Sequence, residues 1–398
     1  MIKHVKIKPE PVRNRAGQDS IASCPGGYRI VKSAGLLAVL LIIAMLVWTP
    51  RAEALPYLCC KYYCLVDAHT GQVILSRSAD ESRQVASTTK MMTAILAAEY
   101  ADPQELATVS DAAAQTPKYV IGLRGGQQIR VEELLKAALI RSANDSAVVL
   151  GEHVAGDIDL FAHLMSLKAV VIGAHHTHFA NPSGLPDSAN YSSAYDLTCI
   201  GRFLLGKPEL AALVSTRQTT FQHPGYRAEM IITNTNGLLD SYPGATGIKT
   251  GTTNLAGQCL VASATRQGRH LIAVALKSGD RTGDCARLLN YGFNECRLIK
   301  VVDHSDVLKE IWVTGGERPK AAIIPAQDVA LWQGGNNKLN IEKVVRMDYQ
   351  WEAPLQKGRQ VGELRLYADG NLVKVCPLVA GEEVRKQGNL VNWLRAIF

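Results

Sequence analysis

Three short polar motifs in the middle of the chain contain residue types that can form and stabilise an acyl-enzyme. Ser87-Thr88-Thr89-Lys90 places a hydroxyl and an amine three positions apart, and residues at this spacing share one face of a helix. Ser142-Ala143-Asn144 adds a second hydroxyl and an amide, and Lys249-Thr250-Gly251 adds a second cation beside another hydroxyl. A serine activated by a neighbouring base is a nucleophile. The three motifs therefore predict acyl transfer through a serine.

Each motif taken alone also has an ordinary structural explanation. Ser87 could cap the start of a helix, Ser142 and Asn144 suit a turn where a helix stops, and the Lys249 motif could be a plain strand end. About one Ser-x-x-Lys match is expected by chance in a chain of this size. The order of the three motifs, and their predicted positions at a helix start, a helix–helix junction and an edge strand, favours the catalytic interpretation.

Lys90 can act as a base only if its pKa lies well below the usual lysine range. Burial lowers that pKa, and so does a neighbouring cation, which Lys249 would supply if its strand lies alongside. Lys249 could also orient an anionic substrate, and the hydroxyl of Thr250 could bind a carboxylate. Gly251 would let a ligand approach the strand backbone closely. No glycine directly precedes Lys249, so the segment is not a phosphate-binding P-loop.

Hydrophobic periodicity predicts the elements that hold these motifs. A strand–turn–strand unit precedes a buried helix that starts at Ser87, and an amphipathic helix ends at Ser142. After about residue 246 the period changes from helix to strand, with turns short enough for antiparallel pairing. The predicted strands are 62–66, 72–75, 247–253, 257–265 and 269–276, and a helix is expected around 286–291. Residues 55–297 are thus predicted to form an α/β domain in which an antiparallel sheet packs against a helical lobe.

The rest of the chain is expected to contain a small all-β domain and a terminal helix. Residues 303–380 hold short apolar runs between turn residues, and Asp369-Gly370 separates two of them as a hairpin signal. Apolar side chains fall on about half of the helical wheel in the last eleven residues. This pattern predicts an amphipathic helix within 385–398 that lies on a membrane surface, or alternatively packs on the protein itself.

Charge and hydropathy at the start of the chain predict export. The formal net charge is +7. Residues 1–54 hold eight Lys/Arg and three Asp/Glu, which leaves a body with a net charge of only +2 and no clustered basic face for nucleic acid. A basic segment, an apolar run over 34–48 and Ala52-Glu53-Ala54 resemble a cleavable signal peptide, with a retained anchor as the alternative.

Cysteine and histidine clusters give no convincing metal site. Cys59, Cys60 and Cys64 lack a second pair of ligands at zinc spacing. Three histidines at 175, 176 and 178 have no carboxylate partner in the sequence nearby. The sequence predicts neither a metal nor a cofactor, and it leaves disulfide pairing open.

Three longer segments identify a family. Arg83–Ala94, Phe179–Leu185 and Gly247–Thr253 resemble the corresponding segments of low-molecular-weight penicillin-binding proteins, which are serine-type D-Ala-D-Ala carboxypeptidases. The resemblance runs from about residue 57 onward. It implies a DD-peptidase fold like that of β-lactamases, followed by an all-β domain and a membrane-associating helix. The implied partners are peptidoglycan stem peptides, β-lactam inhibitors and the outer surface of the cytoplasmic membrane.

The resemblance also implies a role for each site residue. Ser87 would be the acylated nucleophile, Lys90 the base and Ser142 a proton relay. The expected substrate-binding residues are Asn144, Lys249, Thr250, Gly251, Thr252 and Arg281, with the backbone N–H groups of Ser87 and Thr252 as the oxyanion hole. Arg281 would bind the terminal carboxylate, although the loop before it is shorter than in the family.

Two other functions remain open at this level. A class A-like β-lactamase shares the acylation groups but needs efficient deacylation, usually through a positioned glutamate, and the sequence offers none that is convincing. A non-catalytic cell-wall-binding protein could keep the fold without the chemistry. The complete Ser87, Lys90 and Lys249 set argues against that function.

Overall fold

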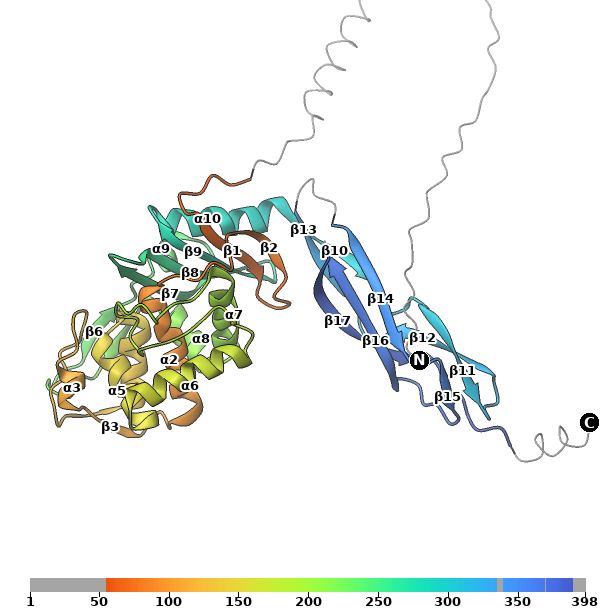
Figure 1. The fold of residues 1–398 in the computed structure, drawn as a ribbon, viewed down its shortest axis with the longest axis horizontal. Coiled ribbons are helices and arrows are strands. Elements are labelled where there is room, and N and C mark those ends of the chain that lie inside the picture. The colour runs from red at the N-terminus through yellow and green to blue at the C-terminus, as the bar shows by residue number, and fades with distance from the viewer. Residues whose placement is uncertain (1–54, 335–338, 369, 389–398) are drawn as a thin grey trace, which may run out of the picture.

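The described chain forms two lobes joined end to end (Figure 1). The computed structural model describes residues 55–334, 339–368 and 370–388. The predicted signal peptide, 1–54, and residues 389–398 of the predicted terminal helix lie outside these ranges. The first part of that helix, 385–388, is described and is not helical, because Lys386 forms a β-bridge with Gly316.

A five-stranded antiparallel sheet forms the centre of the first lobe. Its order is β2-β1-β9-β8-β7, so β1 pairs with β2 on one side and, on the other, with β9, which lies about 200 residues later in the chain. The strands are β1 (Tyr62–Asp67), β2 (Val73–Arg77), β7 (Ala245–Thr253), β8 (Gly257–Arg266) and β9 (Arg269–Ser278). Their pairing confirms the antiparallel sheet that the sequence predicts. Because β7 lies at an edge, the Lys249 motif is on an open side of the sheet.

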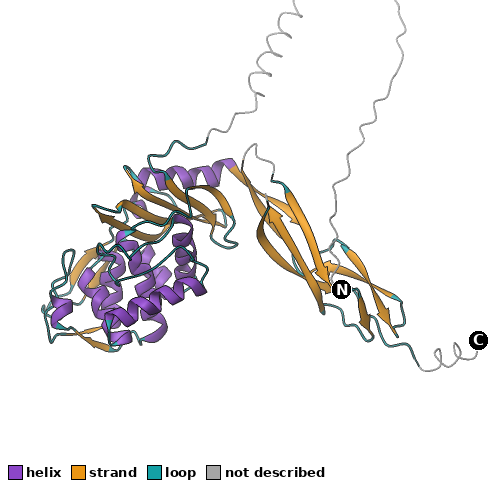
Figure 2. Cartoon of the chain, in the orientation of Figure 1, coloured by secondary structure: helices purple, strands orange, loops and turns teal. Residues whose placement is uncertain are grey.

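Helices cover both faces of this sheet (Figure 2). Helix α10 (Arg281–Asn290) packs on β8 and β9 from one side, and α7 (Ala194–Leu205) packs on β1 and β9 from the other. The helical lobe predicted from the sequence is the group of helices on the α7 side of the sheet, within the first lobe. It contains α2 (Lys90–Tyr100), α4 (Val131–Lys136), α5 (Asn144–Ala155), α6 (Ile158–Val171), α7 and α8 (Pro208–Ser215).

Short elements complete this lobe. They are the one-turn segments η1 (Ala86–Thr89), α3 (Asp111–Ala114), η2 (Ala137–Arg141), α9 (Leu238–Ser241) and η3 (Tyr291–Glu295). Two small ribbons pair β3 (Leu106–Thr108) with β4 (Gln128–Arg130) and β5 (Gln218–Phe221) with β6 (Met230–Thr233).

Helix α2 lies at the centre of the helical lobe. Its first eight residues, from Lys90 to Ala97, are all buried, which confirms the prediction of a buried helix from its nearly continuous apolar composition. The helix contacts α5, α6 and α7. A polar residue at its N-terminus is consequently removed from water, and this fixes the environment of Lys90.

The second lobe is all-β, as predicted. A six-stranded sheet of order β14-β16-β17-β12-β11-β15 lies beside the ribbon β10–β13. The strands are β10 (Cys296–Val302), β11 (Lys309–Thr314), β12 (Lys320–Pro325), β13 (Val329–Gly334), β14 (Ile341–Met347), β15 (Gln350–Glu352), β16 (Gln360–Ala368) and β17 (Asn371–Ala380). Ala368 pairs with Asn371, which confirms the predicted hairpin.

No helix among the described residues has the length and apolarity needed to cross a membrane.

Buried hydrogen bonds join the two lobes at the β1–β2 hairpin. Gln72 accepts from the backbone N–H of Trp332 at 2.7 Å and donates to its carbonyl at 2.8 Å. The indole Nε1 of Trp332 donates to Asp67 at 2.7 Å. Asp67 also accepts from Thr70 within its own turn, so it shapes the hairpin and additionally anchors the second lobe.

Removing the Gln72 side chain should loosen this junction without altering the chemistry. Gln72→Ala leaves a buried N–H and a buried carbonyl of Trp332 unpaired, and we expect it to lower the free energy of unfolding by about 1–3 kcal/mol. Urea denaturation would measure the loss. The exposed Gln356→Ala is the matched control. Equal stability of the two variants would contradict a structural role for the junction.

Candidate active site

Ser87 lies in η1, immediately before the N-terminus of α2. Its Oγ accepts a hydrogen bond of 3.0 Å from Nζ of Lys90. Neither η1 nor α2 has a side-chain cap, since Val85 and Thr89 occupy the cap positions. The structure therefore does not support the helix-cap explanation of Ser87, and it joins the hydroxyl and the amine as the motif predicts.

The Lys90 side chain is fully buried and surrounded by polar atoms. Besides Ser87, its Nζ donates to Oδ1 of Asn144 and to the carbonyl of Ser183, both at 2.6 Å. Burial holds the pKa of Lys90 well below its ordinary value, and the positive charge of Lys249 lowers it further. The carboxylate of Asp145 acts in the opposite direction. Because the pKa of Lys90 is lowered overall, the uncharged amine is favoured next to the Ser87 hydroxyl.

Lys249 forms the second buried cationic centre. Its Nζ donates to Oγ of Ser142 at 2.8 Å and to the carbonyl of Thr250 at 3.2 Å. Burial lowers its pKa to about 7, and the guanidinium of Arg281 contributes to the decrease. Ser142 follows η2 with a left-handed backbone (φ 67°), and this turns its hydroxyl toward the sheet. The two predicted lysines thus share one site.

The strand β7 passes very close to the turn 85–87 that carries the predicted nucleophile Ser87 (the nucleophile turn). A Cβ on Gly251 would lie 2.7 Å from the carbonyl oxygen of Val85 and 2.9 Å from the backbone nitrogen of Ser87. The sequence predicts that Gly251 lets a ligand approach the strand backbone, and in the structure the chain's own backbone at Val85 and Ser87 also approaches Gly251 closely. A side chain here would separate the edge strand from Ser87.

Thr250 lies on the edge strand β7, and the side chain of Arg281, at the start of α10, reaches the same strand. Nη1 of Arg281 donates to the carbonyl of Gly251 at 3.0 Å and to Oγ1 of Thr252 at 2.7 Å. The hydroxyl of Thr250 is 2.7 Å from that of Thr235. Despite the shortened loop, Arg281 therefore reaches the predicted binding strand. Thr235 is a member of this group that the sequence motifs do not reveal.

Asp145 is a second residue that the motifs do not reveal. Its buried carboxylate accepts backbone N–H bonds from Ile121, Gly122 and Leu123, and from Ser146 in its own helix. The same loop approaches Asn144, whose backbone N–H donates to Tyr119 and whose side-chain amide donates to Pro117. An acidic residue directly after Asn144, in the first turn of a helix, was the available signal. It indicates only a favourable charge at a helix N-terminus.

The segment 181–184 supplies the remaining partner of Lys90. Oδ1 of Asn181 accepts from the backbone N–H groups of Ser183 and Gly184 at 3.2 and 2.8 Å. Gly184 has φ +78°, and a Cβ there would lie 2.1 Å from the carbonyl of Ala86. The glycine is therefore required for the segment to pack against the nucleophile turn.

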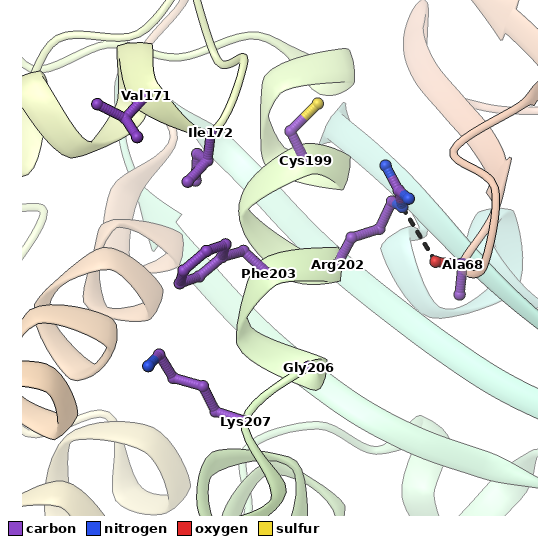
Figure 3. Close-up of a pocket in the computed structure, with 8 residues that line it drawn as sticks. All are labelled: Ala68, Val171, Ile172, Cys199, Arg202, Phe203, Gly206 and Lys207. Atoms are coloured by element: carbon purple, nitrogen blue, oxygen red, sulfur yellow. Dashed lines mark hydrogen bonds between the residues drawn. The ribbon is translucent and has the colours of Figure 1, made fainter. Parts of the chain in front are cut away.

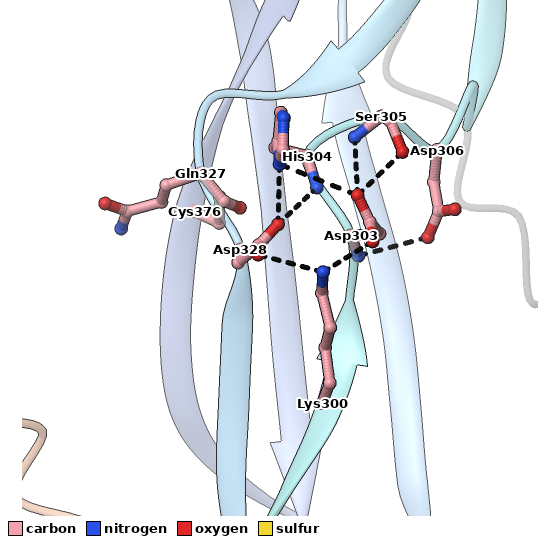
Figure 4. Close-up of polar contacts among 8 residues, drawn as sticks. All are labelled: Lys300, Asp303, His304, Ser305, Asp306, Gln327, Asp328 and Cys376. Carbon is pink, nitrogen blue, oxygen red and sulfur yellow. Dashed lines mark hydrogen bonds and ion pairs between the residues drawn. The ribbon is translucent and has the colours of Figure 1, made fainter.

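The clusters of potential metal ligands have other partners. His178 stacks on Tyr191 and Nδ1 of His176 lies 3.9 Å from Oδ1 of Asp196, and all three histidines are exposed. In the second lobe Asp303, His304 and Asp328 converge (Figure 4).

In that cluster the ammonium of Lys300 already occupies the position between the two aspartates. No metal is inferred at either cluster. None of the eight cysteines among the described residues forms a disulfide.

Comparison with known proteins agrees with this geometry. The D-alanyl-D-alanine carboxypeptidase family profile matches residues 50–279, and the profile for the C-terminal domain of penicillin-binding protein 5 matches residues 297–386. The chain is 30% identical to the D-alanyl-D-alanine carboxypeptidase DacA of Escherichia coli K12, over 86% of this chain and 89% of that protein. The chain is 29% identical to the D-alanyl-D-alanine carboxypeptidase DacF of Bacillus subtilis, over 82% of this chain and 86% of that protein.

A solved structure shares both lobes. Penicillin-binding protein 5 from Haemophilus influenzae aligns with a TM-score of 0.69 and 26% identity, over 84% of this chain and all of that one. The fold and the serine–lysine site thus define a penicillin-binding serine peptidase. The chain belongs to the D-alanyl-D-alanine carboxypeptidase family, and the β-lactamase and non-catalytic alternatives are not favoured.

Neutralising Asp145 should destabilise the loop over the site. Asp145→Asn replaces a buried charged acceptor of several N–H groups, so we expect the free energy of unfolding to fall by about 2–3 kcal/mol and acylation by penicillin to slow. Urea denaturation and labelled penicillin would measure both. Asp240, an exposed acid in the first turn of α9, gives the control Asp240→Asn. Similar losses in both variants would contradict the proposed support.

The pH dependence of acylation should report the interaction between the two lysines. If neutral Lys90 is the base, acylation slows as pH falls through its lowered pKa. Lys249→Met removes a cation that lowers this pKa, so the acidic limb should move to higher pH. Rates of penicillin adduct formation between about pH 5 and pH 10 would test this. Lys357→Met, in the other lobe, should leave the limb in place, and a shift to lower pH in Lys249→Met would refute the coupling.

Proposed function

We propose that this D-Ala-D-Ala carboxypeptidase removes the terminal D-alanine of peptidoglycan stem peptides through an acyl-enzyme on Ser87. The observation that carries this assignment is the fully buried Lys90, whose Nζ lies 3.0 Å from the Ser87 hydroxyl. A buried amine in contact with a hydroxyl can accept its proton as the oxygen attacks.

In the proposed acylation step, Oγ of Ser87 attacks the carbonyl carbon of the penultimate D-alanine while Lys90 takes the hydroxyl proton. The carbonyl oxygen becomes an oxyanion, which the backbone N–H groups of Ser87 and Thr252 would stabilise. The C–N bond then breaks, and the leaving amine receives a proton. D-Alanine departs, and the rest of the peptide remains as an ester on Ser87.

Ser142 and Lys249 are suited to carry the proton that the leaving amine needs. The hydroxyl of Ser142 accepts from Lys249 at 2.8 Å, and both residues lie beside the Lys90 group. We assign Ser142 as the relay and Asn144 as a group that orients both Lys90 and the peptide. In deacylation, water takes the place of the leaving amine, and the same groups act in reverse.

The β7 edge is the proposed binding strand for the peptide. Lys249 and Arg281 give it positive charge, and the hydroxyls of Thr250 and Thr252 can accept or donate hydrogen bonds. We propose that Arg281 and Thr250 bind the terminal carboxylate of the substrate. β-Lactams would enter as substrate mimics and leave a long-lived acyl group, because no glutamate of the described residues hydrogen-bonds to Ser87, Lys90 or Asn144.

We propose an extracytoplasmic location for the enzyme. The predicted signal peptide at residues 1–54 supports export. The apolar face predicted for the last eleven residues supports peripheral attachment to the outer face of the cytoplasmic membrane. A helix this short binds a membrane weakly by itself, so stable attachment needs a second membrane contact.

Release of free D-alanine from a synthetic D-Ala-D-Ala peptide tests the assignment of Ser87. Ser87→Ala should reduce the release by about a thousandfold or more and should abolish covalent labelling by penicillin. Lys90→Ala should also lose acylation, and a cooperative thermal unfolding transition should show that this variant is still folded.

An exposed serine in α9 offers the matched control. Ser241→Ala removes a hydroxyl that bonds only to its own helix, so release and labelling should stay at the wild-type level. Penicillin labelling that persists in Ser87→Ala would identify a different nucleophile. Fast steady-state turnover of a chromogenic cephalosporin by the wild type would instead indicate a β-lactamase.

A further inference from the structure

Helix α6 exposes a row of large aliphatic side chains that no described part of the chain covers. Its inner side buries Phe161 and Met165 against the core. On its outer side the exposed fractions of Leu160, Leu167 and Val171 are 49%, 50% and 78%. A helix that is apolar on all sides is ordinarily buried on all sides. The outer side of α6 is therefore an exposed apolar face of the kind that marks an interaction site.

The spacing of these side chains is that of a helix–helix contact. Leu160, Leu164, Leu167 and Val171 follow one another at intervals of four, three and four residues, which is the seam of a two-stranded coiled coil. The seam runs almost the whole length of α6, about 20 Å. Leu164 is half-buried and also packs against the core, whereas the other three are exposed. An approaching helix could pack its side chains over the exposed three and the outer side of Leu164.

The seam is complementary to itself when the helix is reversed. If a second α6 lies antiparallel, with a two-fold axis midway between Leu164 and Leu167, each Leu164 meets the Leu167 of the other copy. The same register places each Leu160 opposite the Val171 of the other copy. Both ends of the seam are matched at once, as a two-fold symmetric contact requires.

A hollow at the end of α6 extends this match. About 600 Å³ in volume, it is lined by Val171, Ile172 and Phe203, with Arg202 and Lys207 beside them (Figure 3). In the antiparallel register the other copy's Leu160 reaches the mouth of this hollow.

Charges at the two ends of α6 are complementary in the same register. The N-terminal end carries Asp157 and Asp159, and these carboxylates of one copy would approach Arg202 and Lys207 of the other. Within each copy Lys207 also pairs with Glu99, and Arg202 donates to the carbonyls of Ala68 and His69. Opposite charges at the two ends, together with antiparallel helix dipoles, favour this arrangement over a parallel one.

We propose that α6 forms a two-fold symmetric, antiparallel contact with α6 of a second copy of this chain, in the register that pairs Leu164 with Leu167. A contact of this length buries less than the roughly 800 Å² per partner of a standard interface. The dimer is accordingly reversible, with dissociation in about the micromolar range.

Sedimentation velocity of the full chain over a concentration series tests the dimer. Leu167→Glu places a charge in the centre of the seam and should weaken self-association by about tenfold or more. The control is Leu298→Glu on β10, where the leucine is equally exposed at 51%, and it should associate like the wild type. D-Alanine release should be unchanged in both, because α6 contributes no group to the active site.

Mixing two variants tests the register. Leu164→Lys and Leu167→Glu should each self-associate weakly, whereas their mixture should form a heterodimer in which lysine faces glutamate. A parallel contact, or a different register, would give no preference for the mixture.

Three outcomes would overturn the proposal. They are a wild type that stays monomeric at about 100 μM, well above the expected dissociation constant, equal weakening by Leu298→Glu, and no gain on mixing. Loss of binding to phosphatidylglycerol vesicles in Leu167→Glu with dimerisation intact would also overturn it, because that result would assign the face to a membrane.

Discussion

The active site depends on keeping two lysine side chains away from water in the same place. An isolated buried ammonium costs several kcal/mol, and two of them also repel each other. The protein surrounds Lys90 with the Asn144 side chain and the Ser183 carbonyl, and Lys249 with the Ser142 hydroxyl. These partners come from two separate segments, 142–144 and 181–184, so the helices must be assembled before the lysines can be buried. The same burial lowers the pKa values of both lysines. The burial that costs folding free energy is therefore also what makes Lys90 suited to act as a base.

The nucleophile turn is held between two glycines. Gly184 packs against the carbonyl of Ala86 from one side, and Gly251 packs against Val85 and the Ser87 nitrogen from the other. Ala86 itself has φ 51°, a conformation that costs a non-glycine residue roughly 1–2 kcal/mol. Close packing on both sides maintains this strained conformation. It also fixes the direction of the Ser87 backbone N–H, which the proposed oxyanion hole needs.

The sequence was sufficient for the fold class and the motif residues because both depend on local patterns. Periodicity located β7, β8 and β9, and the three motifs named Ser87, Lys90 and Lys249, whose atoms the structure brings together. Contacts between distant segments were beyond that reasoning. From the sequence, Asp145 is only an acidic residue in the first turn of a helix, and its hydrogen bonds to the loop 121–123 are visible only in the structure. Ser183 contacts Lys90 through its backbone carbonyl, which every residue type has, so the sequence gives no signal for this contact. Likewise, the Gln72–Trp332 junction joins positions 260 residues apart.

The two edges of the central sheet serve different purposes. The β2 side contacts β13 of the second lobe, next to the Gln72 and Trp332 hydrogen bonds, so it is occupied by the chain's own structure. On the opposite side, none of the described strands pairs with the outer edge of β7. An unpaired strand edge presents a row of N–H and C=O groups to which an extended peptide can bind. Because the second lobe attaches at the β2 edge, it leaves the outer edge of β7 open for the proposed peptide substrate.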